Sequence, residues 1–210
     1  MTSKKEYFNQ RNSSLLKDNR SYAAKREVET IKFILETFFK YKITAGMNVL
    51  DLGSGDKFLK NELEERGMIY RDYDINDIDF ETDKFNDDDN KFDLVVSLAV
   101  IEHIKNPNLF LNECKRVLKK NSYLYLSTPN WKYSKDTFWD DPTHVKPYSE
   151  DSLKNTLSSK GFRNVEILPN LRCKSKWWYE GKFKFFKAYY LLPFKGDTKF
   201  VPNFLKGRSK

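Results

Sequence analysis

Short apolar runs alternate along this chain with segments of helical periodicity, and this alternation restricts the fold more than any other feature. The run Leu94–Val96 is apolar on both sides of a strand, which predicts burial on both faces of a sheet. Further strands are predicted in MNVLDL (47–52), MIYRDYD (68–74), SYLYLSTPN (122–130) and RNVEIL (163–168), with a short one at 78–81. We therefore predict a doubly wound, mostly parallel α/β sheet with helices on both faces, whose final strand the sequence does not identify.

Helical periodicity begins near residue 23 and returns between the predicted strands. One face of the first long helix should carry Val28, Ile31, Leu35 and Phe38. Later helices are predicted at FLKNELEER before Gly67, after an Asn106 cap with Pro107 at the first helical position, and at SEDSLKNTLSSK before Gly161. The two cysteines, at 114 and 173, have no metal-type spacing, so we predict no metal site and assign the first to the core.

A glycine turn follows the first predicted strand in VLDLGSGD. Asp51 precedes Gly53 by two residues, and Gly55 completes the turn, which allows a close backbone approach to a ligand. A dinucleotide fingerprint would need a small residue at 58, where this chain has phenylalanine. Asp74 ends the second strand, 19 residues after Gly55, where an acid commonly accepts ribose hydroxyls.

These segments, together with FDLVVSLAVIEHI and DPTHVKPYSEDSLKNTLSSKGF, resemble the class I S-adenosylmethionine-dependent methyltransferases. The most similar branch is the small bacterial methyltransferase type 11 group. The resemblance extends from about residue 49 to 167 and implies S-adenosyl-L-methionine as the cofactor. It says little about the methyl acceptor.

The resemblance also implies roles for matching residues. Asp51, Gly53 and Gly55 would hold the methionine end of the cofactor, and Asp74 the ribose. Asp83 would meet the adenine amino group beside Phe85, and the backbone of Ser97, Leu98 and Ala99 would line the cofactor. Two departures affect these roles: Lys57 replaces the usual third glycine, and the segment from 74 to 83 is too short for the customary helix.

Both histidines of the chain fall in loops expected beside the acceptor. Glu102 and His103 follow the strand predicted in KFDLVVSL (91–98), where they could act in catalysis, cap the next helix or have a structural role. His144 lies in the loop before the predicted helix of 149–160. A histidine with an ordinary pKa can take a hydroxyl proton, and we favour His144 over His103 as the base.

Positive charge is concentrated at the end of the chain. The last 60 residues hold 14 Lys and Arg against 4 Asp and Glu, and residues 171–210 add 11 aromatic side chains. This predicts a basic, aromatic extension that packs on the domain of residues 1–170 or contacts a membrane surface peripherally. Residues 1–45 would form a helical lid. The lack of an apolar leader favours a cytoplasmic protein, at the inner membrane face if the extension binds lipid.

The expected function is O-methylation of a small acceptor, such as a sugar or a lipid-linked glycan intermediate in polysaccharide biosynthesis. Alternatives are a quinone-type or RNA methyltransferase, or a cofactor-binding interaction subunit without catalysis. We do not expect a nucleic-acid partner, because the core shows no basic face and no aromatic stacking module. The sequence leaves the oligomeric state open.

Overall fold

The computed structural model describes residues 4–14 and 20–168 of the 210-residue chain. It divides into two compact units, Met1–Thr128 and Pro129–Lys210. The expectation of one domain over 1–170 with an N-terminal lid stays a prediction. The predicted basic extension at 171–210 lies outside the described residues. Among the described residues, the helices are too short or too polar to cross a membrane.

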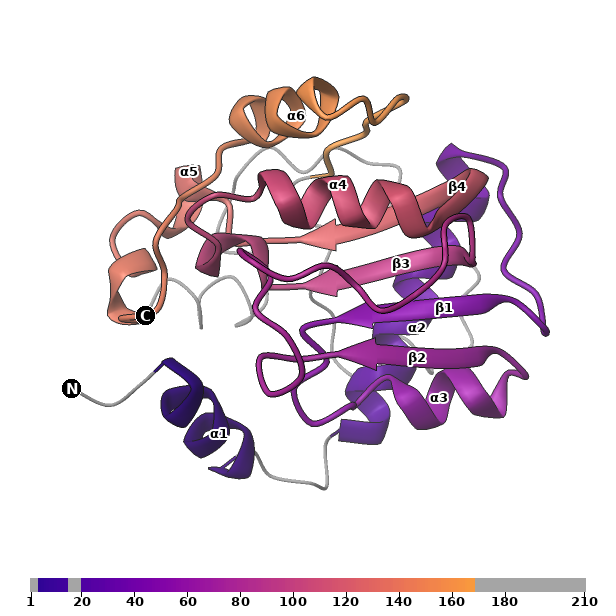
Figure 1. Ribbon diagram of the computed structural model, residues 1–210, viewed down its shortest axis with the longest axis horizontal. Coiled ribbons are helices and arrows are strands. Elements are labelled where there is room, and N and C mark those ends of the chain that lie inside the picture. Colours follow the sequence, from indigo (N-terminus) through magenta and orange to yellow (C-terminus); the bar gives the residue numbers. More distant parts are fainter. Residues whose placement is uncertain (1–3, 15–19, 169–210) are drawn as a thin grey trace, which may run out of the picture. The chain divides into compact units, whose positions relative to one another are not determined.

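The first unit is built around a four-stranded parallel sheet. Its elements are α1 (Lys4–Ser14), α2 (Arg20–Phe38), β1 (Asn48–Leu52), α3 (Lys60–Glu65), β2 (Ile69–Tyr73), β3 (Phe92–Leu98), α4 (Asn108–Val117) and β4 (Leu118–Ser127). The strand order is β2-β1-β3-β4, and every pairing is parallel. Helix α2 runs behind the sheet and α4 lies in front of it (Figure 1). The predicted parallel α/β sheet with helices on both faces is confirmed.

Helix α2 covers one face of the sheet with the periodic stripe that the sequence predicts. Val28, Ile31 and Leu35 are buried in one cluster with the strand residues Val49 and Leu94. Fully burying such a side chain contributes about 1.5–3 kcal/mol. The fourth predicted member of the stripe is wrong: Phe38 is 37% exposed. The helix ends at that residue, and the following Phe39 and Tyr41 pack against the cluster instead.

Helix α4 carries the buried stripe Phe110, Leu111, Cys114 and Val117. The predicted core position of Cys114 is confirmed, and burial raises the pKa of its thiol. The helix begins one residue later than a proline at the first helical position would require. Pro107 is therefore the N-cap in place of the predicted Asn106, the residue before it, whose Oδ1 accepts the Asn108 amide at 3.2 Å.

Two predicted strands are absent. Residues 78–81 form turns, since Asp79 accepts the Glu81 amide on Oδ1 at 2.8 Å and the Asp83 amide on its carbonyl at 2.8 Å. Such local side-chain bonds compete with strand pairing. Residues 163–168 pair with no strand of the described chain, and Val165 and Ile167 are only half-buried. Their alternation therefore does not place them in a ladder, and β4 is the edge of the described sheet.

The second unit contains α5 (Trp131–Ser134), a 3₁₀ turn at Phe138–Asp140 and α6 (Glu150–Ser159). Helix α6 begins at a reciprocal capping box between Ser149 and Ser152. Gly161 follows its end with a φ of +78°, as the sequence predicts for a glycine stop.

Candidate cofactor site at the carboxyl edge of the sheet

The strand order places a natural crevice at the ends of β1 and β3. From β1 the chain passes to β2 on one side, whereas β3 and β4 lie on the other side. In open parallel sheets, ligands bind beyond the carboxyl ends of the strands at such a reversal. The glycine turn follows β1 directly at this point.

The glycine turn is tightly packed between the two neighbouring strands. Gly53 has a φ of +76°, and its amide donates to the Tyr73 carbonyl at 2.8 Å. A Cβ built on Gly53 would lie 2.3 Å from Cγ2 of Val100, which follows β3. Gly55 has a φ of +58°, and its amide donates to Oδ2 of Asp74 at 2.7 Å. The structure thus brings together the predicted turn and the predicted acid of the second strand.

Asp51 is a buried acid at this edge, with an exposed fraction of 2%. Burial raises its pKa from 3.8 to about 7, and the negative charges of Asp72 and Asp74 act in the same direction. The Tyr70 hydroxyl donates to Asp51 Oδ2 at 3.0 Å and opposes that shift. Burial also raises the pKa of the Tyr70 phenol.

Asp74 is half-buried, and burial raises the pKa of its carboxyl against the hydrogen bonds from the Gly55 and Ile75 amides. Among the residues that the structure describes, no lysine or arginine forms an ion pair with Asp51 or Asp74. The edge is therefore a negative site, and a cationic ligand would favour the ionised form of both acids.

Three residues of this edge were not identified from the sequence. Asp72 accepts the Ser54 hydroxyl at 2.9 Å and the Lys57 ammonium at 2.9 Å on Oδ2. Lys57, which was noted only as a departure, has a φ of +59°. One signal was available: Asp72 precedes Asp74 by two residues, a spacing that places both acids on the same side of an extended chain.

The predicted backbone segment Ser97–Ala99 closes the end of β3. Ser97 pairs in register with Leu52 and is fully buried. Its Oγ has no hydrogen-bond partner among the described residues. Leu98 is half-buried, and Ala99 has a φ of +56° while its amide donates to the Ser127 carbonyl at 2.9 Å. The segment lies beside the carboxyl end of β1, as the predicted role requires.

The geometry gives less support to the predicted contacts of Asp83 and Phe85 with adenine. Asp83 is exposed, and its carboxylate accepts the Asp79 amide at 2.9 Å and the Thr82 hydroxyl at 3.1 Å. Phe85 is buried, with its ring stacked on Tyr73 at a centroid distance of 5.6 Å. These hydrogen bonds join Asp83 to its own loop, so its contact with adenine stays a prediction.

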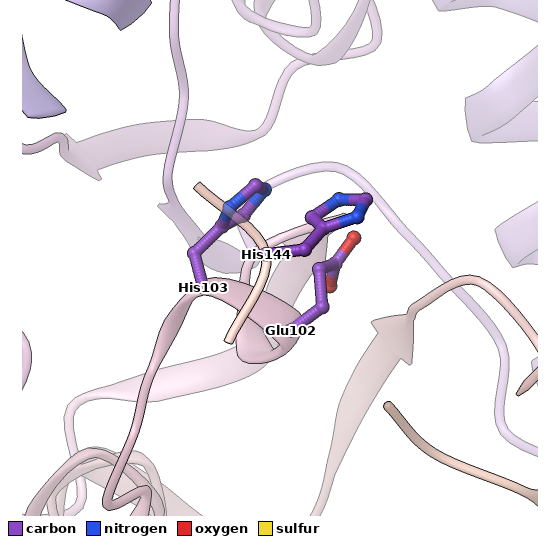
Figure 2. A group of neighbouring side chains, drawn as sticks. All are labelled: Glu102, His103 and His144. Atoms are coloured by element: carbon purple, nitrogen blue, oxygen red, sulfur yellow. The ribbon is translucent and has the colours of Figure 1, made fainter. Parts of the chain in front are cut away.

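Glu102 and His103 lie in the 3₁₀ turn Ile101–His103 that follows β3, where Figure 2 shows both side chains. Glu102 is fully buried and accepts the Thr128 hydroxyl at 2.9 Å. The buried His103 ring packs edge-on against the Phe8 ring, with a centroid distance of 5.0 Å. The backbone carbonyl of His103 accepts the Lys4 ammonium at 2.5 Å. These contacts agree with the structural alternative, and the catalytic roles of both residues stay predictions.

His144, also labelled in Figure 2, belongs to the second unit. Its Nδ1 lies 2.6 Å from the Phe138 carbonyl, and its ring lies on the Phe138 ring at 4.4 Å. Because a carbonyl only accepts, Nδ1 carries a proton, and in the neutral ring Nε2 then holds the lone pair. Oδ2 of Asp141 lies 3.9 Å from Nε2. The ring therefore has the tautomer that a base at Nε2 needs.

Comparison with known proteins gives one consistent family. The model of the methyltransferase domain family matches residues 22–167. A probable S-adenosylmethionine-dependent methyltransferase of Mycobacterium tuberculosis is 36% identical over 82 residues, which are 38% of this chain and 30% of the relative. A ubiquinone biosynthesis O-methyltransferase of Glaesserella parasuis is 40% identical over 43 residues, 20% of this chain and 18% of that protein.

A crystal structure of an S-adenosylmethionine-dependent methyltransferase from Archaeoglobus fulgidus is also similar. It is 30% identical, with a TM-score of 0.50, over 67% of this chain and 71% of that one. The chain spans less than a third of the length of the mycobacterial relative.

Proposed function

We propose that this chain, which belongs to the S-adenosylmethionine-dependent methyltransferase family, transfers a methyl group from S-adenosylmethionine to a hydroxyl of a small acceptor. The observation that carries this proposal is the meeting of Asp51, the glycine turn and Asp74 at the reversal point of the sheet. A sugar or a lipid-linked glycan intermediate is the acceptor class that we favour.

The residues at this edge fit the cofactor. Gly53 lets the turn pack directly against Val100 after β3, because a Cβ at this position would overlap the valine side chain. Asp51 is positioned for an ammonium, and binding a cation lowers the cost of ionising this buried acid. Asp74 can accept hydroxyl hydrogen bonds, as expected of an acid at the end of a second strand. Asp83 is proposed for the adenine amino group, and the backbone of Ser97–Ala99 is proposed to line the cofactor.

The bound cofactor would supply an electrophilic methyl group on its sulfonium. Because that methyl is already activated, the chain's main task is to hold the acceptor hydroxyl in line with it. We propose that Nε2 of His144 accepts the hydroxyl proton, while Nδ1 keeps its own proton on the Phe138 carbonyl. Glu102 and His103 remain proposed for the acceptor side.

Methyl transfer from radiolabelled S-adenosylmethionine tests the activity. The purified chain would be incubated with monosaccharides, nucleotide sugars, lipid-linked saccharides, catechols as quinone precursors, and RNA. Label in a saccharide fraction is the expected result. Binding of the cofactor without transfer to any acceptor class would favour the non-catalytic alternative.

His144→Ala tests the base in whichever acceptor reaction is found. Proton removal belongs to the transition state, so kcat should fall about 100-fold or more while KM for the acceptor changes little. His103→Ala is measured beside it, because His103 is the alternative base. An unchanged kcat for His144→Ala together with a loss in His103→Ala would assign the base to His103 instead.

A quinone-type ring is the second candidate acceptor. It is favoured by the similarity to the ubiquinone biosynthesis O-methyltransferase of Glaesserella parasuis, although that match covers only 20% of this chain. Label in the catechol fraction and none in the saccharides would select it.

A further inference from the structure

The loop between β1 and α3 holds three left-handed residues, and one of them is not a glycine. Gly53, Gly55 and Lys57 have φ values of +76°, +58° and +59°. Glycine adopts this conformation without a steric penalty, but a lysine does so only at a cost in free energy. The surroundings of Lys57 must therefore offset that cost.

A single carboxylate of β2 binds this loop twice. Asp72 accepts the Ser54 hydroxyl on Oδ2 at 2.9 Å. The Lys57 ammonium lies 2.9 Å from Oδ2 and 3.2 Å from Oδ1 of the same carboxylate. The hydrogen bond to Asp72 is the main reason that the Lys57 pKa is raised. Ser54 is buried, so the Asp72 carboxylate is held at the inner side of the turn.

The ion pair with Lys57 distinguishes Asp72 from the other two acids of the edge, Asp51 and Asp74. Asp72 pairs in register with Asp51 and lies two residues before Asp74. Its charge is matched by Lys57, whereas Asp51 and Asp74 have no Lys or Arg partner among the described residues. The Gly55 amide between Ser54 and Lys57 meets Asp74, so any shift of the turn changes the site that the cofactor would use.

We propose that Lys57 and Asp72 are positioning residues, whose ion pair sets the glycine turn for cofactor binding without touching the cofactor. The proposal rests on the proposed function, because it concerns the same site. Lys57, which stands where the family usually has a glycine, would then have a role that depends on its positive charge and on Asp72.

Isothermal calorimetry with S-adenosylhomocysteine, the demethylated cofactor, tests this. Lys57→Met keeps the length of the side chain and removes the charge. We expect Kd to rise about fivefold, the value of one well-placed ion pair with a partly exposed partner. Lys57→Arg should keep Kd within about twofold of the wild-type value, since it keeps the charge. Asp72→Asn should weaken binding as Lys57→Met does, and the double variant should be no weaker than either single one.

A matched ion pair at the other end of the sheet is the control. Lys119 lies 2.7 Å from Asp93, with side-chain exposed fractions of 40% and 18%, against 53% and 13% for Lys57 and Asp72. Lys119→Met should leave Kd unchanged. The ratio of the Kd values of Lys57→Met and wild type should also fall toward one in about 1 M salt, because salt screens an exposed pair.

Two results would overturn the proposal: wild-type affinity in Lys57→Met, or additive losses in the double variant. A wild-type protein that does not bind S-adenosylhomocysteine would instead refute the proposed function, so the two failures are distinguishable.

Discussion

The two ends of the sheet use acidic residues in opposite ways. At the amino end, Asp93 accepts the Asn48 amide at 2.9 Å and pairs with Lys119 at 2.7 Å. At the carboxyl end, Asp51 and Asp74 have raised pKa values and no Lys or Arg partner among the described residues. The first arrangement stabilises the fold. In the second, burial disfavours the ionised form of both carboxyls, and a cationic ligand would offset that cost. The difference supports the proposed cofactor site at the carboxyl edge of the sheet.

The pH dependence of stability should show this difference most strongly. The folded state holds the Asp51 proton up to a pKa of about 7, whereas the unfolded chain loses it near 3.8. Stability that is present below pH 4 should therefore be lost as pH rises to about 7, by up to about 4 kcal/mol from this residue. Urea unfolding of Asp51→Asn should lack this loss, so that the variant exceeds wild type in stability at pH 8.

The matched variant at the amino end is Asp93→Asn. It should be less stable than wild type at pH 8, because it removes a paired carboxylate. If Asp51→Asn were also less stable than wild type at pH 8, the Asp51 carboxylate would be a stabilising group and the contrast between the two edges would fail.

Two glycines with similar backbone conformations extend the comparison. Gly53 at the carboxyl edge and Gly46 at the amino edge have φ values of +76° and +82°. A Cβ at Gly53 would lie 2.3 Å from Val100, whereas one at Gly46 meets nothing within 4 Å. Gly53→Ala should lose about 3 kcal/mol in the free energy of unfolding, from strain plus overpacking, and Gly46→Ala about 1 kcal/mol.

Thermal unfolding of both variants measures this difference. Val100→Ala in the Gly53→Ala background removes the Cγ atoms that clash and should recover part of the loss. Equal losses in the two single variants would mean that the glycine turn is not packed against Val100.

The sequence predicts this edge well because local patterns determine it. An apolar strand, a turn that needs left-handed residues and an acid at the next strand end are each visible in short segments, and a parallel sheet brings them to one edge. The Lys57–Asp72 pair was missed because it depends on which side chains meet across 15 residues. The strand predicted at 163–168 failed because alternation alone supplies no partner strand.

The acidic loop at 78–83 shows a second limit. Its residues fit a short strand by composition, yet Asp79 and Asp83 accept backbone amides of their own loop. Such local hydrogen bonds decide between turn and strand, and a pattern of apolar residues does not reveal them. The same bonds place the Asp83 carboxylate on its loop, a detail that the resemblance could not supply.

A smaller effect should separate the two edges in ligand binding. Asp74→Ala removes a charged acceptor and should raise Kd for S-adenosylhomocysteine about 10-fold or more. Asp93→Ala should change that Kd by less than about twofold, and should lower stability by about 1 kcal/mol. Calorimetry and urea unfolding of the same two samples should show a loss of affinity only in Asp74→Ala and the loss of stability in Asp93→Ala. A loss of affinity in Asp93→Ala equal to that in Asp74→Ala would contradict it.

The central claim is that the carboxyl edge is a cofactor site whose buried acid must ionise to bind. Calorimetry of the wild-type protein with S-adenosylmethionine between pH 5.5 and 8.5 tests it directly, with a nicotinamide dinucleotide as the control ligand. The affinity should rise about tenfold per pH unit below the Asp51 pKa of about 7 and level off above it. The dinucleotide should give no heat. No binding of S-adenosylmethionine at pH 8.5, or an affinity independent of pH, would contradict the account.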